Sequence, residues 1–194
     1  VVTIVTAPNA GTATDITVCE TSGAVDLAGQ LTGEDTGGTW TRIAGSNGTF
    51  VASTGMFTPE IGATNSTFRY TASATGCTSD TEDVVVTINA APNAGIASNV
   101  TVCETAGAVD LAGQVAGEDS GGAWTRIAGA GGTFVAATGM FTPAVGTTTS
   151  TFRYTITGTS PCADDTEDVV VTIVTAPNAG TATDITVCET SGAV

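Results

Sequence analysis

The five cysteines are the side chains with the clearest covalent chemistry: Cys19, Cys77, Cys103, Cys162 and Cys188. The chain contains no histidine, which excludes Cys–His and Ser–His–Asp catalysis and histidine-containing zinc sites. Disulfides, cysteine-only metal ligation and a catalytic thiol remain. No Cys-x-x-Cys occurs, so we favour disulfides. We predict the pairs Cys19–Cys77 and Cys103–Cys162, with the partner of Cys188 beyond Val194.

The predicted disulfides close loops of 58 and 59 residues. On the chain-entropy estimate, a loop of this size stabilises a small domain by about 4 kcal/mol. Such bonds persist in oxidising compartments outside the cytosol. The predicted disulfides therefore suit an oxidising compartment.

Acidic side chains form the second group with possible chemistry, because carboxylates on converging loops can supply the six to eight oxygens that calcium prefers. No Asp-x-Asp-x-Asp-Gly loop occurs, and solvated turns that keep the protein soluble are the alternative interpretation. The candidate calcium ligands are Glu34, Asp35, Asp80, Glu82, Asp83, Glu118, Asp119, Asp164, Asp165, Glu167 and Asp168.

Net charge limits the partners. The 19 acidic and 4 basic residues give a net charge of −15, and all four bases are arginine. Such a surface repels nucleic acid and anionic lipid, and no apolar run approaches the ~20 residues of a membrane helix. No nucleophile, base and oxyanion arrangement is evident, so we expect no enzyme activity, no nucleic-acid binding and no membrane insertion.

Internal repetition defines the organisation of the chain. The motif Ala-Pro-Asn-Ala-Gly begins at Ala7, Ala91 and Ala176, and residues 1–25 are identical to residues 170–194. A domain-length repeat of this kind predicts a tandem array. We expect the last strand of a preceding repeat at 1–6, full repeats at 7–90 and 91–175, and the first strands of a following repeat at 176–194.

Within each repeat, short alternating segments predict strands. Examples are "TDITVC", "STFRYT" and "DVVVTIN", with Phe68 and Tyr70 on one face of their strand. Asn47-Gly48 and its counterpart Gly131-Gly132 suit a tight hairpin turn with positive φ. Six or seven strands in about 84 residues predict an all-β fold of tandem immunoglobulin-like antiparallel β-sandwiches, with one disulfide each.

The combination of "APNAG", "TVCE", Gly-Gly-x-Trp, "TFRYT", a second cysteine and "DVVVTI" resembles the immunoglobulin-like repeats of large Bacteroidota cell-surface proteins, which include adhesins and filaments. The resemblance implies disulfide-bonded sandwiches, an extracellular location and export by the type IX secretion system. It supplies no catalytic residues.

Two function classes follow. The first is a structural stalk or filament segment of a repetitive extracellular adhesin, in which neighbouring repeats are the partners and the chain acts as a semi-rigid spacer. The alternative is an adhesive module that binds surface glycans or other filament chains through many weak contacts, with or without calcium.

Overall fold

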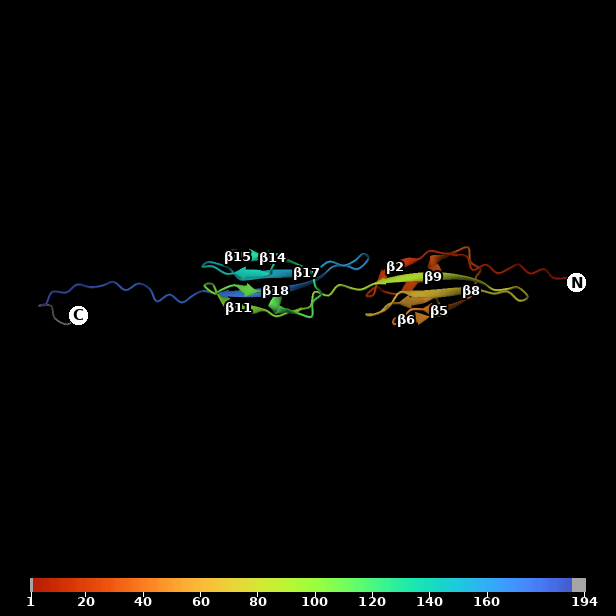
Figure 1. The fold of residues 1–194 in the computed structure, drawn as a ribbon, viewed down its shortest axis with the longest axis horizontal. Coiled ribbons are helices and arrows are strands. Elements are labelled where there is room, and N and C mark those ends of the chain that lie inside the picture. The colour runs from red at the N-terminus through yellow and green to blue at the C-terminus, as the bar shows by residue number, and fades with distance from the viewer. Residues whose placement is uncertain (1, 190–194) are drawn as a thin grey trace.

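The structure is a computed structural model that describes residues 2–189. Two β-sandwich domains lie end to end along the long axis, with the N- and C-terminal segments at opposite ends (Figure 1). One hydrophobic core falls within residues 10–86 and a separate core within residues 94–171. No helix among the described residues is long and apolar enough to cross a membrane.

Each domain pairs a four-stranded sheet with a three-stranded sheet. In the first domain the larger sheet has the order β2-β9-β8-β5 and the smaller β3-β7-β6, with a separate β1–β4 pair. The elements are β1 (Thr12–Ala13), β2 (Ile16–Cys19), β3 (Val25–Asp26), a 3₁₀ turn (Ala28–Gln30), β4 (Leu31–Thr32), β5 (Thr39–Ala44), β6 (Thr49–Val51), β7 (Met56–Thr58), β8 (Ser66–Ala72) and β9 (Asp80–Asn89).

The second domain repeats this topology, with sheets β11-β18-β17-β14 and β12-β16-β15 and the pair β10–β13. Its elements are β10 (Ile96–Ala97), β11 (Val100–Cys103), β12 (Val109–Asp110), a 3₁₀ turn (Ala112–Gln114), β13 (Val115–Ala116), β14 (Ala123–Ala128), β15 (Thr133–Val135), β16 (Met140–Thr142), β17 (Ser150–Ile156) and β18 (Asp165–Val174). The predicted all-β, immunoglobulin-like fold class is confirmed.

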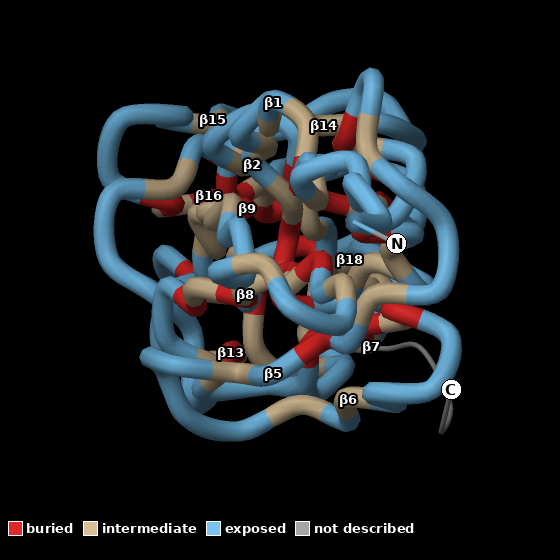
Figure 2. The backbone as a smooth tube through the Cα atoms, turned by 90° about the vertical axis from the view of Figure 1, so that its right-hand side faces the viewer, coloured by how far each residue is buried: buried red, intermediate tan, exposed pale blue. Residues whose placement is uncertain are grey.

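Aromatic side chains fill the space between the sheets, and the buried residues gather there when the molecule is viewed along its long axis (Figure 2). Phe57 and Phe68 are fully buried and their rings lie 4.8 Å apart. Trp40 packs on Tyr70 at 5.2 Å. Gly55 has φ +69°, and a Cβ there would lie 2.8 Å from Nε1 of Trp40, so this turn requires glycine.

The turn at Asn47-Gly48 is one correction to the sequence prediction. Positive φ is confirmed, at 57° and 77°, but the turn closes no hairpin. β5 pairs with β8, whereas β6 pairs with β7 in the other sheet. The turn therefore carries the chain between sheets, which places Phe50 of β6 against Phe68 of β8.

Strand direction decides where the cysteines lie. β2 runs parallel to β9, and Cys19 at the end of β2 is in register with Asn89, the last residue of β9. Both residues lie at the end of the first domain that faces the second domain. Residues 2–6 and 176–189 form no strand, because the strands that pair with their counterparts in a full repeat are not part of this sequence. Residue 1 and residues 190–194 of those predicted segments lie outside the described residues.

Candidate functional site at the junction of the repeats

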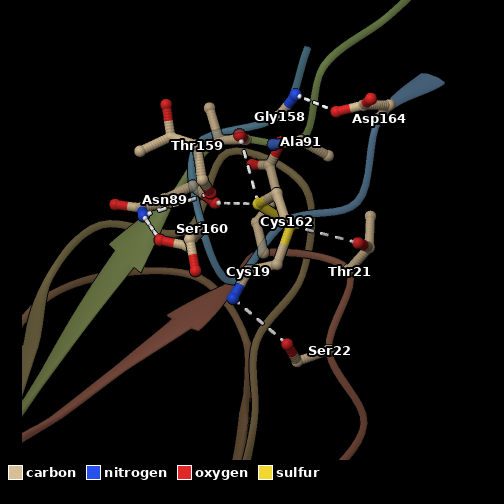
Figure 3. Close-up of a disulfide and its surroundings, with 12 residues drawn as sticks. Cys19, Thr21, Ser22, Asn89, Ala91, Gly158, Thr159, Ser160, Cys162 and Asp164 are labelled. Atoms are coloured by element: carbon tan, nitrogen blue, oxygen red, sulfur yellow. Dashed lines mark hydrogen bonds between the residues drawn. A yellow bond between two sulfur atoms is a disulfide. The ribbon is translucent and has the colours of Figure 1, made fainter.

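A disulfide joins the two domains. Cys19 of the first domain bonds to Cys162 of the second, 143 residues away in the sequence. Cys162 lies in the loop between β17 and β18, which reaches back over the end of β9 (Figure 3). Both bonded cysteines are buried, while Cys77 and Cys103 are half-exposed and form no disulfide.

The predicted pairs Cys19–Cys77 and Cys103–Cys162 are therefore wrong. Cys77 lies three residues before β9 begins, whereas Cys19 lies beside the residue where β9 ends. The 10 residues of β9 separate the two positions by about 30 Å, and the Cα atoms of a disulfide lie within about 7 Å of each other. The two cysteines of one repeat thus face opposite ends of the same domain, which leaves each to bond outside it. The prediction of one disulfide within each domain fails for this reason.

A buried glutamate follows the bonded cysteine and fixes the linker. Glu20 is 8% exposed. Its carboxylate accepts hydrogen bonds from the backbone N–H of Gly62, at 2.7 Å, and of Ala91, at 2.9 Å. The first bond holds the β7–β8 loop and the second holds the interdomain linker, so one carboxylate ties the linker to the first domain.

The second domain holds the same linker from the other side. Asn93 N–H donates to the Asp119 carboxylate at 2.9 Å, and Ala94 N–H donates to Asp165 at 2.7 Å. Pro92, between them and Ala91, has no N–H to satisfy. Every N–H from residue 91 to residue 94 is therefore bound by a carboxylate.

Asn89 completes the junction. Its side-chain amide donates to the backbone carbonyl of Ser160 at 2.8 Å and lies beside the bonded sulfurs (Figure 3). The Cys162 sulfur sits 3.5 Å from the Asn89 carbonyl oxygen and 3.4 Å from that of Ala90. The loop that carries Cys162 is thus held on the linker by polar contacts as well as by the disulfide.

Many carboxylates of the acidic clusters accept hydrogen bonds from backbone N–H groups of the same repeat. In the first domain, Asp35, Asp80 and Glu82 accept hydrogen bonds from the N–H groups of residues 9, 10 and 13. In the second, Asp119, Asp165 and Glu167 bind residues 93, 94 and 97 in the same way, and Asp164 accepts from residue 158.

The remaining candidate calcium ligands are ion-paired or lie in turns. Asp83 pairs with Arg69 at 2.7 Å, and Asp168 pairs with Arg153 at 2.8 Å. These hydrogen bonds from arginine lower the pKa of both carboxyls. Glu34 and Glu118 lie in the β4–β5 and β13–β14 turns. Between residues 2 and 189, no three His, Cys, Asp or Glu side chains group as a metal site would require, so calcium binding stays a prediction from the sequence.

A cleft of about 570 Å³ lies at the junction. Residues of both domains line it: Cys19, Glu20, Thr21, Ile61, Ala91, Pro92, Asn93, Ala163, Asp164 and Asp165. Glu20 and Asn89 were not among the functional residues predicted from the sequence. The signal for Glu20 was present, since Cys-Glu-Thr recurs at 19–21, 103–105 and 188–190.

No protein-family model and no curated protein matches the chain. Solved structures with similar folds include the insect immune protein hemolin, at 11% identity and a TM-score of 0.49, covering 86% of this chain and 47% of hemolin. Others are extracellular domains 3–5 of Drosophila OTK (11%, 0.41, covering 87% and 60%) and immunoglobulin domains 1–4 of Sidekick-1 (12%, 0.41, covering 89% and 48%). The chain spans about half to three fifths of these structures, and the likeness concerns the fold alone.

Proposed function

We propose that this chain is a semi-rigid spacer in the stalk or filament of a repetitive extracellular adhesin. The observation that carries the proposal is the junction, where a disulfide and carboxylate-bound amides fix one domain to the next. A binding module needs an accessible surface, but only a structural array needs the angle between consecutive domains to be fixed. The parent protein is, on the resemblance of its repeats, a surface protein of the Bacteroidota exported by type IX secretion.

Stiffness of the junction tests this function. Fluorescent dyes attached at Thr75 and Ala137, one in each domain, would report interdomain distance in single molecules. We expect one narrow distance distribution for the oxidised chain and a broader one for Cys19→Ser. Replacing Cys103, which forms no disulfide, is the matched control and should leave the distribution narrow. An equally broad distribution in the oxidised chain would show a flexible linker and contradict a spacer role.

The junction cleft favours a second candidate, in which the repeats bind surface glycans. Ile61 is 79% exposed at its edge, and ligand sites combine apolar lining with a few polar groups that fix orientation. Calcium bridging would involve Asp164, which also lines the cleft. Binding of a glycan array to the chain with and without calcium, lost in an Ile61→Asp variant, would support this candidate over a spacer alone.

A further inference from the structure

Two cysteines occupy the positions of the bonded pair without bonding to each other. Cys103 ends β11 as Cys19 ends β2, and Cys77 precedes β9 as Cys162 precedes β18. They lie at the two outer ends of the molecule, Cys77 toward the N-terminus and Cys103 toward the C-terminus. Each outer end therefore carries one half of the chemistry that is complete at the centre.

The Cys77 end already holds its linker. The Cys77 sulfur lies 4.0 Å from the Val5 carbonyl oxygen and 3.8 Å from that of Thr6. Val5 and Thr6 correspond in the repeat to Asn89 and Ala90, whose carbonyls contact Cys162. The loop that carries Cys77 thus lies on its linker as the Cys162 loop does at the central junction.

The end of the molecule that carries Cys103 has the other half of the junction contacts, those of the glutamate with the linker. Glu104 accepts from the N–H groups of Gly146 and Ala176, both at 3.0 Å, and its own N–H donates to the Val174 carbonyl at 2.8 Å. Glu20 makes the same three contacts at the central junction, including a 2.9 Å bond to the Asn89 carbonyl. The linker after the second domain is therefore already seated for a junction.

Each interdomain linker is matched to the cysteine-bearing loop that lies on it, and two types of such pairs occur. At the centre, Asn89 in the linker meets a loop with one extra residue, which supplies the Ser160 carbonyl for its amide. The Val5-Thr6 linker has no such amide and meets the shorter loop of Cys77. Val174-Thr175 is identical to Val5-Thr6, so the second type of junction is seen half at each end of this chain.

We propose that Cys77 and Cys103 are the two halves of a second interdomain disulfide, formed with further repeats of this sequence type. Cys103 bonds to the cysteine at the Cys77 position of the repeat that follows it, and Cys77 bonds to the cysteine at the Cys103 position of the repeat that precedes it. The proposal rests on the spacer function and specifies how it extends along the array: every domain is bonded to both neighbours.

The resulting bonds overlap. The Cys19–Cys162 bond encloses residues 19–162, and the bond from Cys103 begins inside that span. Under a pull along the array, these bonds carry the load past most of each repeat, which limits how far a single domain can extend on unfolding.

Formation of the bond requires an oxidant. Two thiols lose two protons and two electrons as the sulfur–sulfur bond forms, and a small-molecule disulfide accepts them and becomes two thiols. The first step is attack by a thiolate, which releases one thiolate of the oxidant. A hydrogen bond between the Thr105 hydroxyl and the Cys103 sulfur, 3.2 Å apart, lowers the pKa of Cys103, which favours Cys103 as the attacking group.

A chain extended by one repeat tests the proposal. Because residues 170–194 repeat residues 1–25, adding a copy of residues 26–90 after Val194 completes a third repeat. The extended chain is refolded with reduced and oxidised glutathione, its remaining thiols are alkylated, and it is digested with trypsin. We expect the peptide of residues 70–126, which carries Cys103, to be linked to the appended peptide that carries the copy of Cys77.

Two variants assign the link. Peptide 70–126 contains both Cys77 and Cys103. The link should persist in Cys77→Ser, whereas Cys103→Ser should leave the appended thiol open to alkylation. A link from the Cys188 peptide to the appended cysteine, or an appended thiol that stays reduced in the parent chain, would overturn the proposal. The Cys19–Cys162 link is read in the same digest, so the central junction and the spacer function are judged separately.

Discussion

Each outer end of the molecule carries half of the contacts found at the central junction, and among the described residues only the centre is covalently closed. Cys19 and Cys162 meet because two consecutive domains are present, whereas Cys77 and Cys103 each face a position where a neighbouring domain would lie. The glutamate contacts are the same at Glu20 and Glu104. Because Glu104 makes these contacts where Cys103 forms no disulfide, the polar contacts of the linker do not depend on the bond. The disulfide, in contrast, needs a cysteine from a second domain.

Mechanical stretching should show the largest difference. With the central bond intact, 143 residue steps are bypassed when the termini are pulled. Reduction should therefore release about 500 Å of additional contour length, at ~3.5 Å per residue. Magnetic tweezers or force microscopy with and without reductant would measure the gain.

Two variants distinguish an interdomain disulfide from disulfides within each repeat. Cys19→Ser should release the whole length without reductant, and Cys103→Ser should release none. Bonds inside each repeat would instead make the two substitutions release nearly equal lengths.

The two hydrophobic cores, unlike the two ends, should be destabilised equally by equivalent substitutions. Phe68 and Phe152 are both fully buried between two aromatic neighbours at 4.7–4.8 Å. Phe68→Ala and Phe152→Ala should each lower the free energy of unfolding of their own domain by about 3–5 kcal/mol. Denaturant unfolding followed by Trp40 or Trp124 fluorescence, each in a variant with the other tryptophan replaced by Phe, would measure it. Costs that differ by several kcal/mol between the two repeats would show that the cores are not equivalent.

The linker amide should have a smaller effect. Asn89→Val converts the central linker toward the outer type and removes the hydrogen bond to the Ser160 carbonyl. A lost hydrogen bond of this kind costs about 1 kcal/mol, so the equilibrium for forming Cys19–Cys162 should weaken about fivefold in a glutathione titration. Val174→Asn is the matched control and should leave that equilibrium unchanged. An unaltered equilibrium in Asn89→Val would mean that the amide plays no part in closing the junction.

The smallest expected effect is that of low pH on the Glu104 contacts, at the outer end that carries Cys103. Hydrogen bonds from Gly146 and Ala176 lower the pKa of Glu104 below its ordinary value of 4.5. A carboxyl with a lowered folded pKa stabilises its contacts above the unfolded value and loses that contribution as pH falls through the folded one. The protection factor of the Ala176 amide, which is its intrinsic exchange rate divided by its observed rate at the same pH, should therefore fall below about pH 4.5, measured by hydrogen exchange across a pH series. Glu104→Gln should remove the pH dependence of this protection factor, and a protection factor that stays constant down to pH 2 in the parent chain would contradict the assignment.

Much of the fold was predictable because alternation reports burial directly. Phe68 and Tyr70 alternate with half-buried neighbours and are themselves buried, as the pattern predicts. The turn at Asn47-Gly48 shows the limit of such local signals. Positive φ follows from residue type, but which sheet receives the next strand depends on the packing of Phe50 across the core.

The Cys19–Cys162 disulfide could not be derived from the number and spacing of the cysteines. Two cysteines in each repeat fit bonds within a repeat and bonds between repeats equally well, and the choice depends on which end of the sandwich each cysteine reaches. That in turn depends on the parallel pairing of β2 with β9, a long-range contact that no local pattern reports. The contacts of the acidic residues could not be derived from their clustering in the sequence for a related reason: several of them accept hydrogen bonds from backbone amides that are distant in the sequence, as Asp80 does from Ala10.

Disulfide mapping of the chain itself tests the central claim most directly. Trypsin cleaves after the four arginines, Arg42, Arg69, Arg126 and Arg153, so Cys19 lies in peptide 1–42, Cys77 and Cys103 in 70–126, and Cys162 in 154–194. Mass spectrometry of the unreduced digest, with fragmentation to separate Cys162 from Cys188, should find peptide 1–42 bonded to Cys162. Peptide 1–42 bonded to peptide 70–126 would place Cys19 with a cysteine other than Cys162 and contradict a covalent junction between the domains.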